Sequence, residues 1–397
     1  MTTTETVPAR ASVDGASVDG ASVDGASVDG ASVDGASVDG ASVEGASFDG
    51  AKAEAFGGHI MSILTGSLLS SMVDIGHRTG LFAAAAEGPA TSEQLAARAG
   101  LCERYVREWL GAVTAGGIVE YDEATGTFFL PPEHAALLIT PVGVGPLAVA
   151  NTVLAGHLHQ IVQVFREGGG VPYAAFVPEF TDAMDAMGRG VFDTMLLDGY
   201  LPLAPGLAET LAAGARVADV ACGTGHALVI LAQAFPASTF TGYDLDEHAI
   251  ARGRAEAAGA GLKNVTFEVL DVARLTVARP FDVVFVFDAL HDQVDPGAVL
   301  ARIHDALVPG GLLFMREPHA ADTLAGNLAH PMAPVFYSAS TLHCLTVSLA
   351  HGGAGIGLAF GEQLARRMLT EAGFGPADVH PAPGTPFDAV YVTRTAR

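Results

Sequence analysis

The chain has 397 residues, half of them hydrophobic, and a formal net charge of −24. This length and composition allow two or three domains with substantial cores. An acidic excess of this size repels phosphate backbones and argues against broad nucleic-acid binding. The three cysteines lie far apart and form no CxxC pair, so we expect no zinc site, no disulfide framework and a cytoplasmic location.

Membrane elements are not expected either. The N-terminus, MTTTETVPAR, has no apolar core of the kind that a signal peptide needs. Residues 135–156 carry no charge over 22 positions, which is long enough to cross a bilayer. Prolines and glycines interrupt this segment, however, and favour a loop followed by a buried helix.

Residues 11–50 are eight pentapeptides: ASVDG six times, then ASVEG and ASFDG. Small, polar, glycine-rich units bury too little apolar area to order themselves, which predicts a disordered tail over residues 1–52. The alternative is a pentapeptide-repeat β-helix, but eight units would form only about two coils, fewer than stacked repeat folds need.

Residues 53–146 have the pattern of a winged-helix domain. A helix is expected over residues 61–80, and Thr91 or Ser92 caps a short helix that Gly100 ends. A second helix over residues 102–115 is followed by strands at 118–121 and 127–130. The order helix, turn, helix, hairpin is typical of a winged helix.

This module could read DNA through its second helix, or it could dimerise and cover a substrate. Residues 53–150 hold four arginines and ten carboxylates, and the second helix alternates acids and bases. A DNA-reading helix normally carries a basic stripe, so the charges favour the structural role. Residues 147–205 are helical and rich in Phe, Tyr and Met, which suits a connector that contributes to an apolar pocket.

Residues 206–397 alternate strands and helices. Strands are expected at residues 217–220, 239–243, 265–270, 281–287, 312–316 and 388–393, and helices at 246–258, 299–307 and 362–372. This alternation predicts an α/β fold with a Rossmann-like, doubly wound parallel sheet. Ligands of such sheets bind at the carboxyl ends of the strands.

The first strand of this half ends in the sequence DVACGTG. Its glycines let main-chain amides approach a ligand at a helix N-terminus. A dinucleotide fingerprint would need a third glycine where Leu228 stands, and a P-loop would need a lysine that is missing. The glycine bend therefore belongs to neither phosphate-binding motif.

Four carboxylates end successive strands: Asp219, Asp244, Asp271 and Asp288. They should project into one crevice, where Asp244 is placed to accept hydrogen bonds from ribose hydroxyls. An acidic crevice suits a positively charged nucleoside and repels a pyrophosphate. The alternative is that such acids only cap the following helices, and for Asp246 this interpretation is preferred.

DVACGTG resembles motif I of the class I S-adenosylmethionine (SAM) dependent methyltransferases. GYDLD resembles their ribose-binding loop, LDVA their adenine-binding segment, and FDVVFVFDALHD with ALVPGGLLFMREP their fourth and fifth strands. One departure is Ala221, where the family usually has glycine. The resemblance implies SAM as cofactor, bound by Asp219, Ala221, Gly223, Gly225, Asp244, Leu245, Asp271, Val272 and Asp288.

From about residue 53 the chain resembles bacterial two-domain methyltransferases and, more loosely, plant-type small-molecule O-methyltransferases. The latter dimerise through the winged helix and carry their base in a Leu-His-Asp-Trp motif. The resemblance therefore implies a homodimer. This chain has Leu290-His291-Asp292-Gln293 at the place of the motif, which implies His291 as general base, although Gln293 departs from the motif. Residues 319–360 should form a lid in which Phe336, Tyr337 and His343 contact the substrate, the alternative being a structural helix and loop.

These features predict a SAM-dependent methyltransferase that acts on a small acceptor, with a hydroxyl oxygen favoured because of His291. Two other interpretations stay open. One is a SAM-responsive transcriptional regulator that binds DNA through residues 90–130, and the other is an inactive SAM-binding scaffold.

Overall fold

The computed structural model describes residues 48–140, 143–385 and 387–396, and it divides after Gly58 into two units. Residues 1–47, which hold most of the predicted tail, lie outside the described residues. Helix α1 (Gly50–Arg78) begins inside the range expected to be tail and is longer than the helix predicted at 61–80. Among the described residues it is the one helix long and apolar enough to cross a membrane, and its apolar window is not buried.

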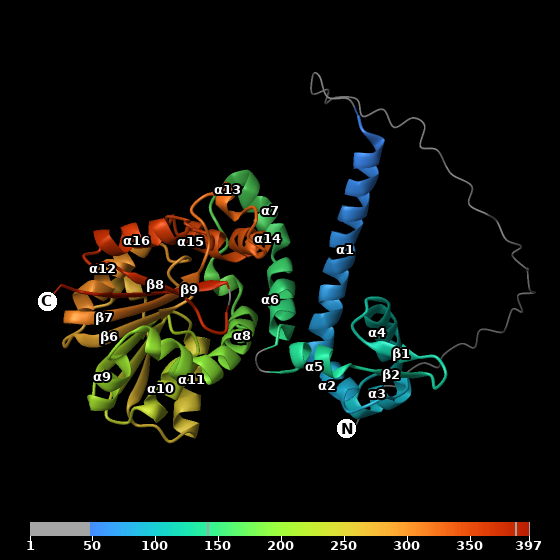
Figure 1. Ribbon diagram of the computed structural model, residues 1–397, viewed down its shortest axis with the longest axis horizontal. Helices are drawn as coiled ribbons and strands as arrows, with labels where there is room; N and C mark the ends of the chain where they lie inside the picture. Colours follow the sequence, from blue (N-terminus) through green and yellow to red (C-terminus); the bar gives the residue numbers. More distant parts are fainter. Residues whose placement is uncertain (1–47, 141–142, 386, 397) are drawn as a thin grey trace, which may run out of the picture. The chain divides into compact units, whose positions relative to one another are not determined.

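The winged helix is present (Figure 1). It comprises α2 (Leu81–Ala86), α3 (Ser92–Ala99), α4 (Glu103–Ala115) and the antiparallel hairpin of β1 (Glu120–Asp122) and β2 (Thr127–Phe129). Thr91 caps α3, its hydroxyl accepting from the Gln94 amide, and Gly100 ends the helix at φ +68°. Val106, Leu110 and Val113, which share one face of α4 at helical spacing, are buried, and so is Leu95 of α3.

The uncharged segment 135–156 forms two short helices, α5 (Pro132–Leu138) and α6 (Gly145–Ala155). After them come α7 (Leu158–Glu167), a 3-10 turn at Tyr173–Ala175, and the long helix α8 (Glu179–Met195). A π-turn (Leu196–Tyr200) and a 3-10 turn (Leu201–Leu203) then lead into α9 (Leu207–Ala213). The expected helical connector is therefore present.

The C-terminal half is built on a seven-stranded sheet with the order β5-β4-β3-β6-β7-β9-β8. The strands are β3 (Arg216–Val220), β4 (Thr239–Asp244), β5 (Val265–Val269), β6 (Phe281–Phe287), β7 (Leu307–Pro318), β8 (Asp378–Pro381) and β9 (Asp388–Arg394). The first five are parallel. The expectation of a wholly parallel sheet needs correction, because β9 runs antiparallel to β7 and β8, which was not predicted, runs antiparallel to β9.

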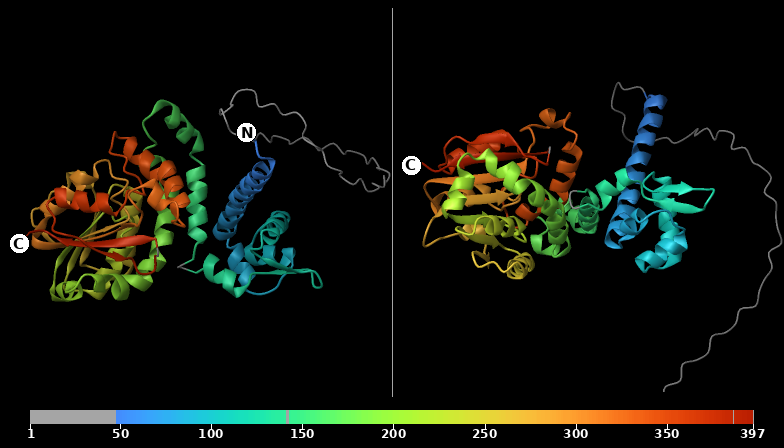
Figure 2. Two further views of the ribbon diagram at one scale, coloured as in Figure 1. Left: turned by 45° about the horizontal axis from the view of Figure 1, so that its top comes forward. Right: turned by 60° about the horizontal axis from the view of Figure 1, so that its bottom comes forward.

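Helices cover both faces of this sheet (Figure 2). Leu211 of α9, Leu228 of α10 (His226–Ala234) and Ile250 of α11 (Glu247–Gly259) share one core with Phe285 and Phe314. α12 (Pro296–Ala306) and α16 (Glu362–Glu371) pack on the other face. The order of the strands reverses between β3 and β6, so a crevice is expected at their carboxyl ends.

Half of the segment 319–360 is helical, and the rest forms turns and loops. Its helical part comprises α13 (Leu324–Asn327), α14 (Ala333–Ala339), a π-turn (Ser340–Cys344) and α15 (Leu345–Leu349). Whether the segment acts as a lid stays a prediction. Within it, the π-turn places His343 and Cys344 inside the protein.

Candidate functional site

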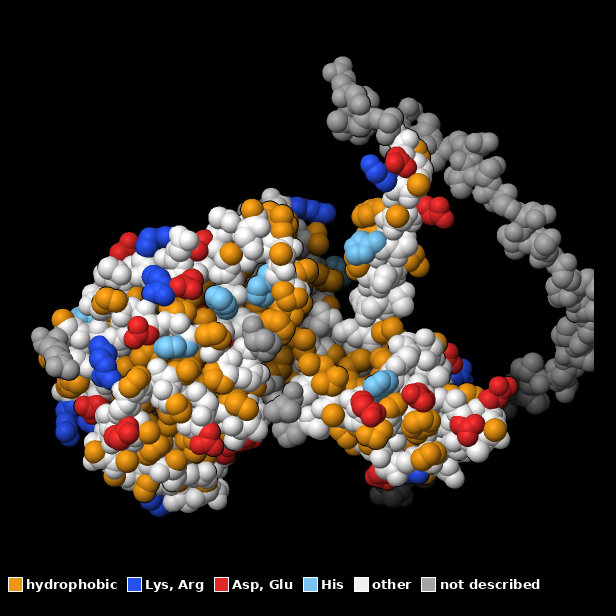
Figure 3. Space-filling view, viewed as in Figure 1, with side chains coloured by type: hydrophobic (Ala, Val, Ile, Leu, Met, Phe, Trp, Pro, Cys, Tyr) orange, Lys and Arg blue, Asp and Glu red, His pale blue; other side chains and the backbone are white. Residues whose placement is uncertain are grey.

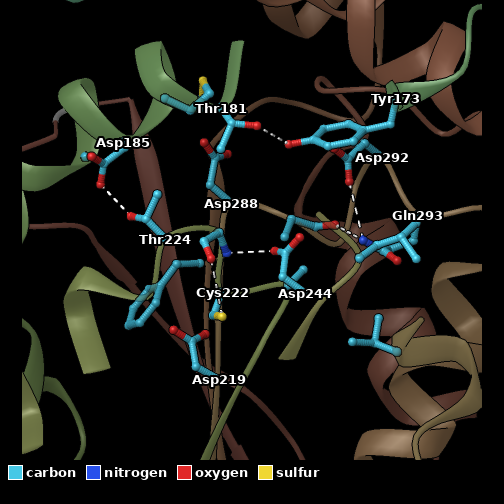
Figure 4. Close-up of a pocket in the computed structure, with 18 of the residues that line it drawn as sticks. Tyr173, Thr181, Asp185, Asp219, Cys222, Thr224, Asp244, Asp288, Asp292 and Gln293 are labelled. Carbon is cyan, nitrogen blue, oxygen red and sulfur yellow. Dashed lines mark hydrogen bonds between the residues drawn. The ribbon is translucent and has the colours of Figure 1, made fainter. Parts of the chain in front are cut away.

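A cavity of about 650 Å³ opens at the carboxyl ends of β3, β4 and β6, beneath α8. Its volume falls within the range of small-molecule sites. Figure 4 shows the side chains of Asp219, Asp244 and Asp288 around Cys222, with Asp185 and Thr181 approaching from α8. The crevice that the sequence predicts is therefore the cavity that the structure contains.

The loop after β3 is held in a left-handed bend. Ala221 has φ +54° and Gly223 φ +54°, and the Gly223 N–H donates to Oδ2 of Asp244 over 2.7 Å. Gly225 precedes α10 and is not in the cavity lining. A Cβ at Gly225 would lie 2.0 Å from the Phe267 ring, so this glycine is needed for close packing of the loop on β5.

All four strand-end carboxylates line the cavity: Asp219, Asp244, Asp271 and Asp288. Asp219 is 1% exposed, and its Oδ1 has no hydrogen-bond partner among the described residues. Burial, and secondarily the charge of Asp244, raise the pKa of Asp219 well above its ordinary value. A cationic ligand in this cavity would offset the cost of these buried negative charges, so the donor set fits a sulfonium and an ammonium group.

Asp244 has unused capacity for a ligand. Its two oxygens accept from the amides of Gly223 (2.7 Å) and Asp246 (2.9 Å), which leaves further lone pairs for ribose hydroxyls. Leu245 and Val272 also line the cavity, where they would flank a nucleoside. Asp246 lies outside the lining and caps α11 by accepting from the His248 amide, as its preferred interpretation predicts.

Ion pairs that were not predicted from the sequence hold helix α8 over the cavity. Arg189 of α8 pairs with Glu256 over 2.9 Å, and Arg252 pairs with Asp185 over 2.6 Å. Asp185 also accepts from the Thr224 hydroxyl, and both line the cavity. Thr224 could have been predicted as a site residue, since it stands between the two motif glycines. No sequence pattern around Asp185 predicts its place in the site.

His291 is buried and lies behind the cavity wall rather than in its lining. Its Nδ1 lies 2.6 Å from Oε2 of Glu317, whose Oε1 accepts from the amides of Ala289 and Leu290. Burial lowers the pKa of His291, but Glu317 and Cys344 outweigh it, and the net pKa is well above the usual value. The imidazole is therefore positively charged near neutral pH.

The next residue, Asp292, does line the cavity. Burial is the largest cause that raises its pKa, to about 7, with Glu317 and Asp288 adding to the rise and His291 opposing it. A carboxylate with a pKa near neutrality is suited to accept a proton. Sequence reasoning singled out the neighbouring histidine and passed over this acid.

Asp288, at φ +57°, also faces the cavity, and its Oδ1 is buried without a partner among the described residues. Asp288, His291 and Glu317 offer ligand atoms within 4.8 Å of one another, as a metal site would. Within this group His291 and Glu317 share a hydrogen bond, while Oδ1 of Asp288 lies 4.0 Å from Nδ1 of His291, and the absence of a metal stays a prediction.

The predicted substrate residues do not lie together. His343 lines the cavity and stacks on Phe180 with ring centroids 4.0 Å apart. Burial lowers its pKa to about 3, so the ring is neutral, and its Nε2 has no partner among the described residues. Phe336 and Tyr337 are absent from the lining, and the Tyr337 hydroxyl accepts from Asn327 instead.

Two stretches of the chain match known protein families. Residues 67–140 match the Rv2258c-like winged HTH domain family, and residues 211–373 match a methyltransferase domain family. The trans-aconitate 2-methyltransferase of Deinococcus radiodurans is 34% identical over 31% of this chain and 45% of its own length. The trans-aconitate 2-methyltransferase of Methylobacterium nodulans is 34% identical over 27% of this chain and 40% of its own length. The chain thus spans less than half the length of these curated relatives.

Solved structures share the fold over most of the chain. Mitomycin 7-O-methyltransferase is 20% identical with a TM-score of 0.63, covering 87% of this chain and 99% of that one. Human N-acetylserotonin methyltransferase, solved with SAM, is 15% identical with a TM-score of 0.65, covering 89% and 100%. These findings show that the chain combines a region that matches the Rv2258c-like winged HTH domain family with a methyltransferase domain, in the fold of solved methyltransferases such as the one determined with SAM.

Proposed function

We propose that the protein transfers the methyl group of SAM to a hydroxyl oxygen of a small, partly apolar molecule. The observation that carries this proposal is the cavity at the carboxyl ends of β3, β4 and β6, in which four carboxylates meet apolar side chains of α8. Oxygen is favoured as the acceptor atom because several structural neighbours are O-methyltransferases.

Bound SAM supplies a methyl group on a sulfonium, which an acceptor can displace in line without acid assistance to the leaving thioether. The chain's own residues bind, align and deprotonate. Asp219 and Asp244 offset the positive charge, and Asp244 accepts from ribose hydroxyls. The left-handed bend at Gly223 leads to the N-terminus of α10, and its main-chain amide holds the Asp244 carboxylate in place.

Proton removal from the acceptor is assigned to Asp292, because its carboxyl group faces the cavity. His291, already paired with Glu317, is positively charged and lowers the pKa of Asp292 from behind the wall. The hypothesis from the sequence, in which His291 itself is the base, requires its ring to lose a proton and reach the cavity. The two assignments predict different pH profiles.

The acceptor end of the cavity is apolar and aromatic. Met184, Met187 and Phe192 of α8 line it, together with Phe287 of β6. Methionines adapt to irregular ligands, and aromatic rings favour planar ones. The neutral ring of His343 leaves Nε2 free to hydrogen-bond a polar group of the acceptor.

The test is a labelled-methyl screen over phenols, carboxylic acids and amines with SAM as donor, alongside calorimetry with SAM and S-adenosylhomocysteine. The proposal predicts labelled product from at least one phenol, accompanied by S-adenosylhomocysteine. SAM binding with no product from any class would favour the inactive scaffold, and failure to bind SAM would overturn the proposal.

A homodimer is proposed for the winged-helix part. Ile60, Met61, Leu64 and Leu68 lie on one side of α1 and are 37%, 60%, 53% and 71% exposed. Apolar side chains run along the face of α1 that is drawn in Figure 3. A second copy would cover this surface. Light scattering of the purified chain should give twice the monomer mass, and Leu64→Asp should shift it toward the monomer.

The rival function is a DNA-binding regulator. On the face drawn in Figure 3, most of the charged side chains of the winged-helix domain are acidic. On α4, Arg104 pairs with Glu108 and Arg107 with Glu103, which leaves little positive charge for phosphates. Salt-sensitive binding to a selected duplex, with no methyl acceptor found, would support the regulator instead.

A further inference from the structure

Arg316 of β7 is a buried cation in the wall of the cavity that the proposed function leaves unused. Its side chain is 8% exposed and lines the cavity near Phe192, Phe287 and Thr385. The guanidinium carbon lies 5.4 Å from the centroid of the Phe192 ring and 6.0 Å from those of Tyr200 and Phe287. These rings stabilise the positive charge but accept no in-plane hydrogen bond.

The hydrogen-bond donors of Arg316 are mostly unused. A guanidinium has five N–H groups. In the described part of the chain its side chain makes one hydrogen bond, from Nη1 to the Tyr200 hydroxyl over 3.2 Å. Among the described residues Nε is buried without a hydrogen-bond partner, and Oδ2 of Asp388 lies 3.6 Å from it. Nη2 makes no hydrogen bond there either and is not a buried atom, so it can donate to an oxygen that enters the cavity here.

The charge of Arg316 is already balanced. Asp388 lies beside it, and Asp288 also faces the cavity. Burial lowers the pKa of Arg316, but Asp388, Tyr200 and Asp288 outweigh it, so the side chain stays cationic. A further carboxylate would meet these two acids and Asp292, whereas a neutral carbonyl oxygen would supply the missing acceptor without adding charge.

We infer that Arg316 determines acceptor specificity by binding a neutral carbonyl oxygen on a planar aromatic ring that lies against Phe192 and Phe287. This inference rests on the proposed function and narrows it to one substrate class, hydroxylated aromatic ketones or quinones. The carbonyl is a second polar group of the acceptor, distinct from the hydroxyl that is methylated.

Three naphthalenes that differ at one position test the inference: 6-hydroxy-2-acetonaphthone, 6-hydroxy-2-naphthoate and 2-naphthol. Each is titrated by calorimetry into the full chain saturated with S-adenosylhomocysteine. The ketone should bind about 10-fold more tightly than 2-naphthol, as expected for a hydrogen bond to a charged donor. The naphthoate should bind no better than the ketone.

Arg316→Met should abolish the preference for the ketone while S-adenosylhomocysteine still binds. Since this change leaves Asp388 unpaired, the double variant Arg316→Met/Asp388→Asn removes both charges and should give the same result in a folded protein. Arg302→Met, at an exposed position on α12, is the matched control and should keep the preference.

Three results would each overturn the inference. The wild type could bind the ketone and 2-naphthol equally, the preference for the ketone could survive in both Arg316 variants, or the naphthoate could bind more tightly than the ketone. These outcomes leave the proposed function standing as long as S-adenosylhomocysteine binds. If S-adenosylhomocysteine itself does not bind, the proposed function fails.

Discussion

The main-chain N–H of Gly223 donates a hydrogen bond to Oδ2 of Asp244 over 2.7 Å. This contact joins the bend after β3 to the acid that ends β4, two features separated by 21 positions in the sequence. It fixes the Asp244 carboxylate while leaving lone pairs open toward the cavity. The cofactor site is thus formed before the cofactor enters, which reduces the entropy lost on binding.

Replacing Asp219 with Asn should weaken SAM binding and stabilise the cofactor-free protein. Because the pKa of Asp219 is raised in the folded state, the folded protein favours the protonated carboxyl group, and its stability falls as pH rises. The gain in melting temperature of Asp219→Asn over wild type should therefore grow between pH 5 and pH 8. Differential scanning calorimetry across this range measures it, and a gain that shrinks with pH would contradict the role of burial.

Ala221 has a left-handed backbone that glycine adopts without strain, at φ +54°. Ala221→Gly should therefore stabilise the protein by about 1 kcal/mol, a rise in melting temperature of a few degrees. The control is Ala255→Gly, at an exposed position inside α11, which should destabilise by about 1 kcal/mol. If Ala221→Gly and Ala255→Gly both lower the melting temperature by a similar amount, the bend at Ala221 is not strained.

The two candidates for the base differ in their pH profiles. If Asp292 is the base, kcat/KM should rise with pH through about 7, and Asp292→Asn should remove this limb and lower turnover about 100-fold or more. His291→Gln should move the limb to higher pH, because a positive charge that lowers the pKa of Asp292 is lost. If His291→Gln removes the limb and Asp292→Asn only shifts it, His291 is the base.

Much of the fold follows from local sequence signals. The helices of the winged helix are predicted by Thr91, Gly100 and the apolar spacing of Leu110 and Val113. The parallel strands are predicted by short apolar runs that precede turns. β8 was not predicted because its residues, Asp378–Pro381, are exposed or half-buried and carry no apolar alternation. The antiparallel direction of β9 depends on its pairing with β7, which no local pattern encodes.

The site was partly predictable for a similar reason. Asp219, Asp244, Asp271 and Asp288 follow strands of one sheet, so the topology alone brings them together. Asp185 reaches the cavity from a helix with no motif around it, and Arg316 from a strand whose sequence resemblance assigns no role to this arginine. Their roles depend on tertiary contacts with Thr224 and Tyr200, which lie 39 and 116 positions away.

The affinity of SAM for wild type and for Asp244→Ala, measured by titration calorimetry, tests the central claim most directly. Losing the ribose acceptor should weaken binding about 100-fold, equivalent to about 2.8 kcal/mol for hydrogen bonds to a charged group. Asp305→Ala, at a side chain that is 71% exposed on α12, is the matched control and should bind as wild type does. Unchanged affinity in Asp244→Ala, in a variant that melts like wild type, would contradict the account.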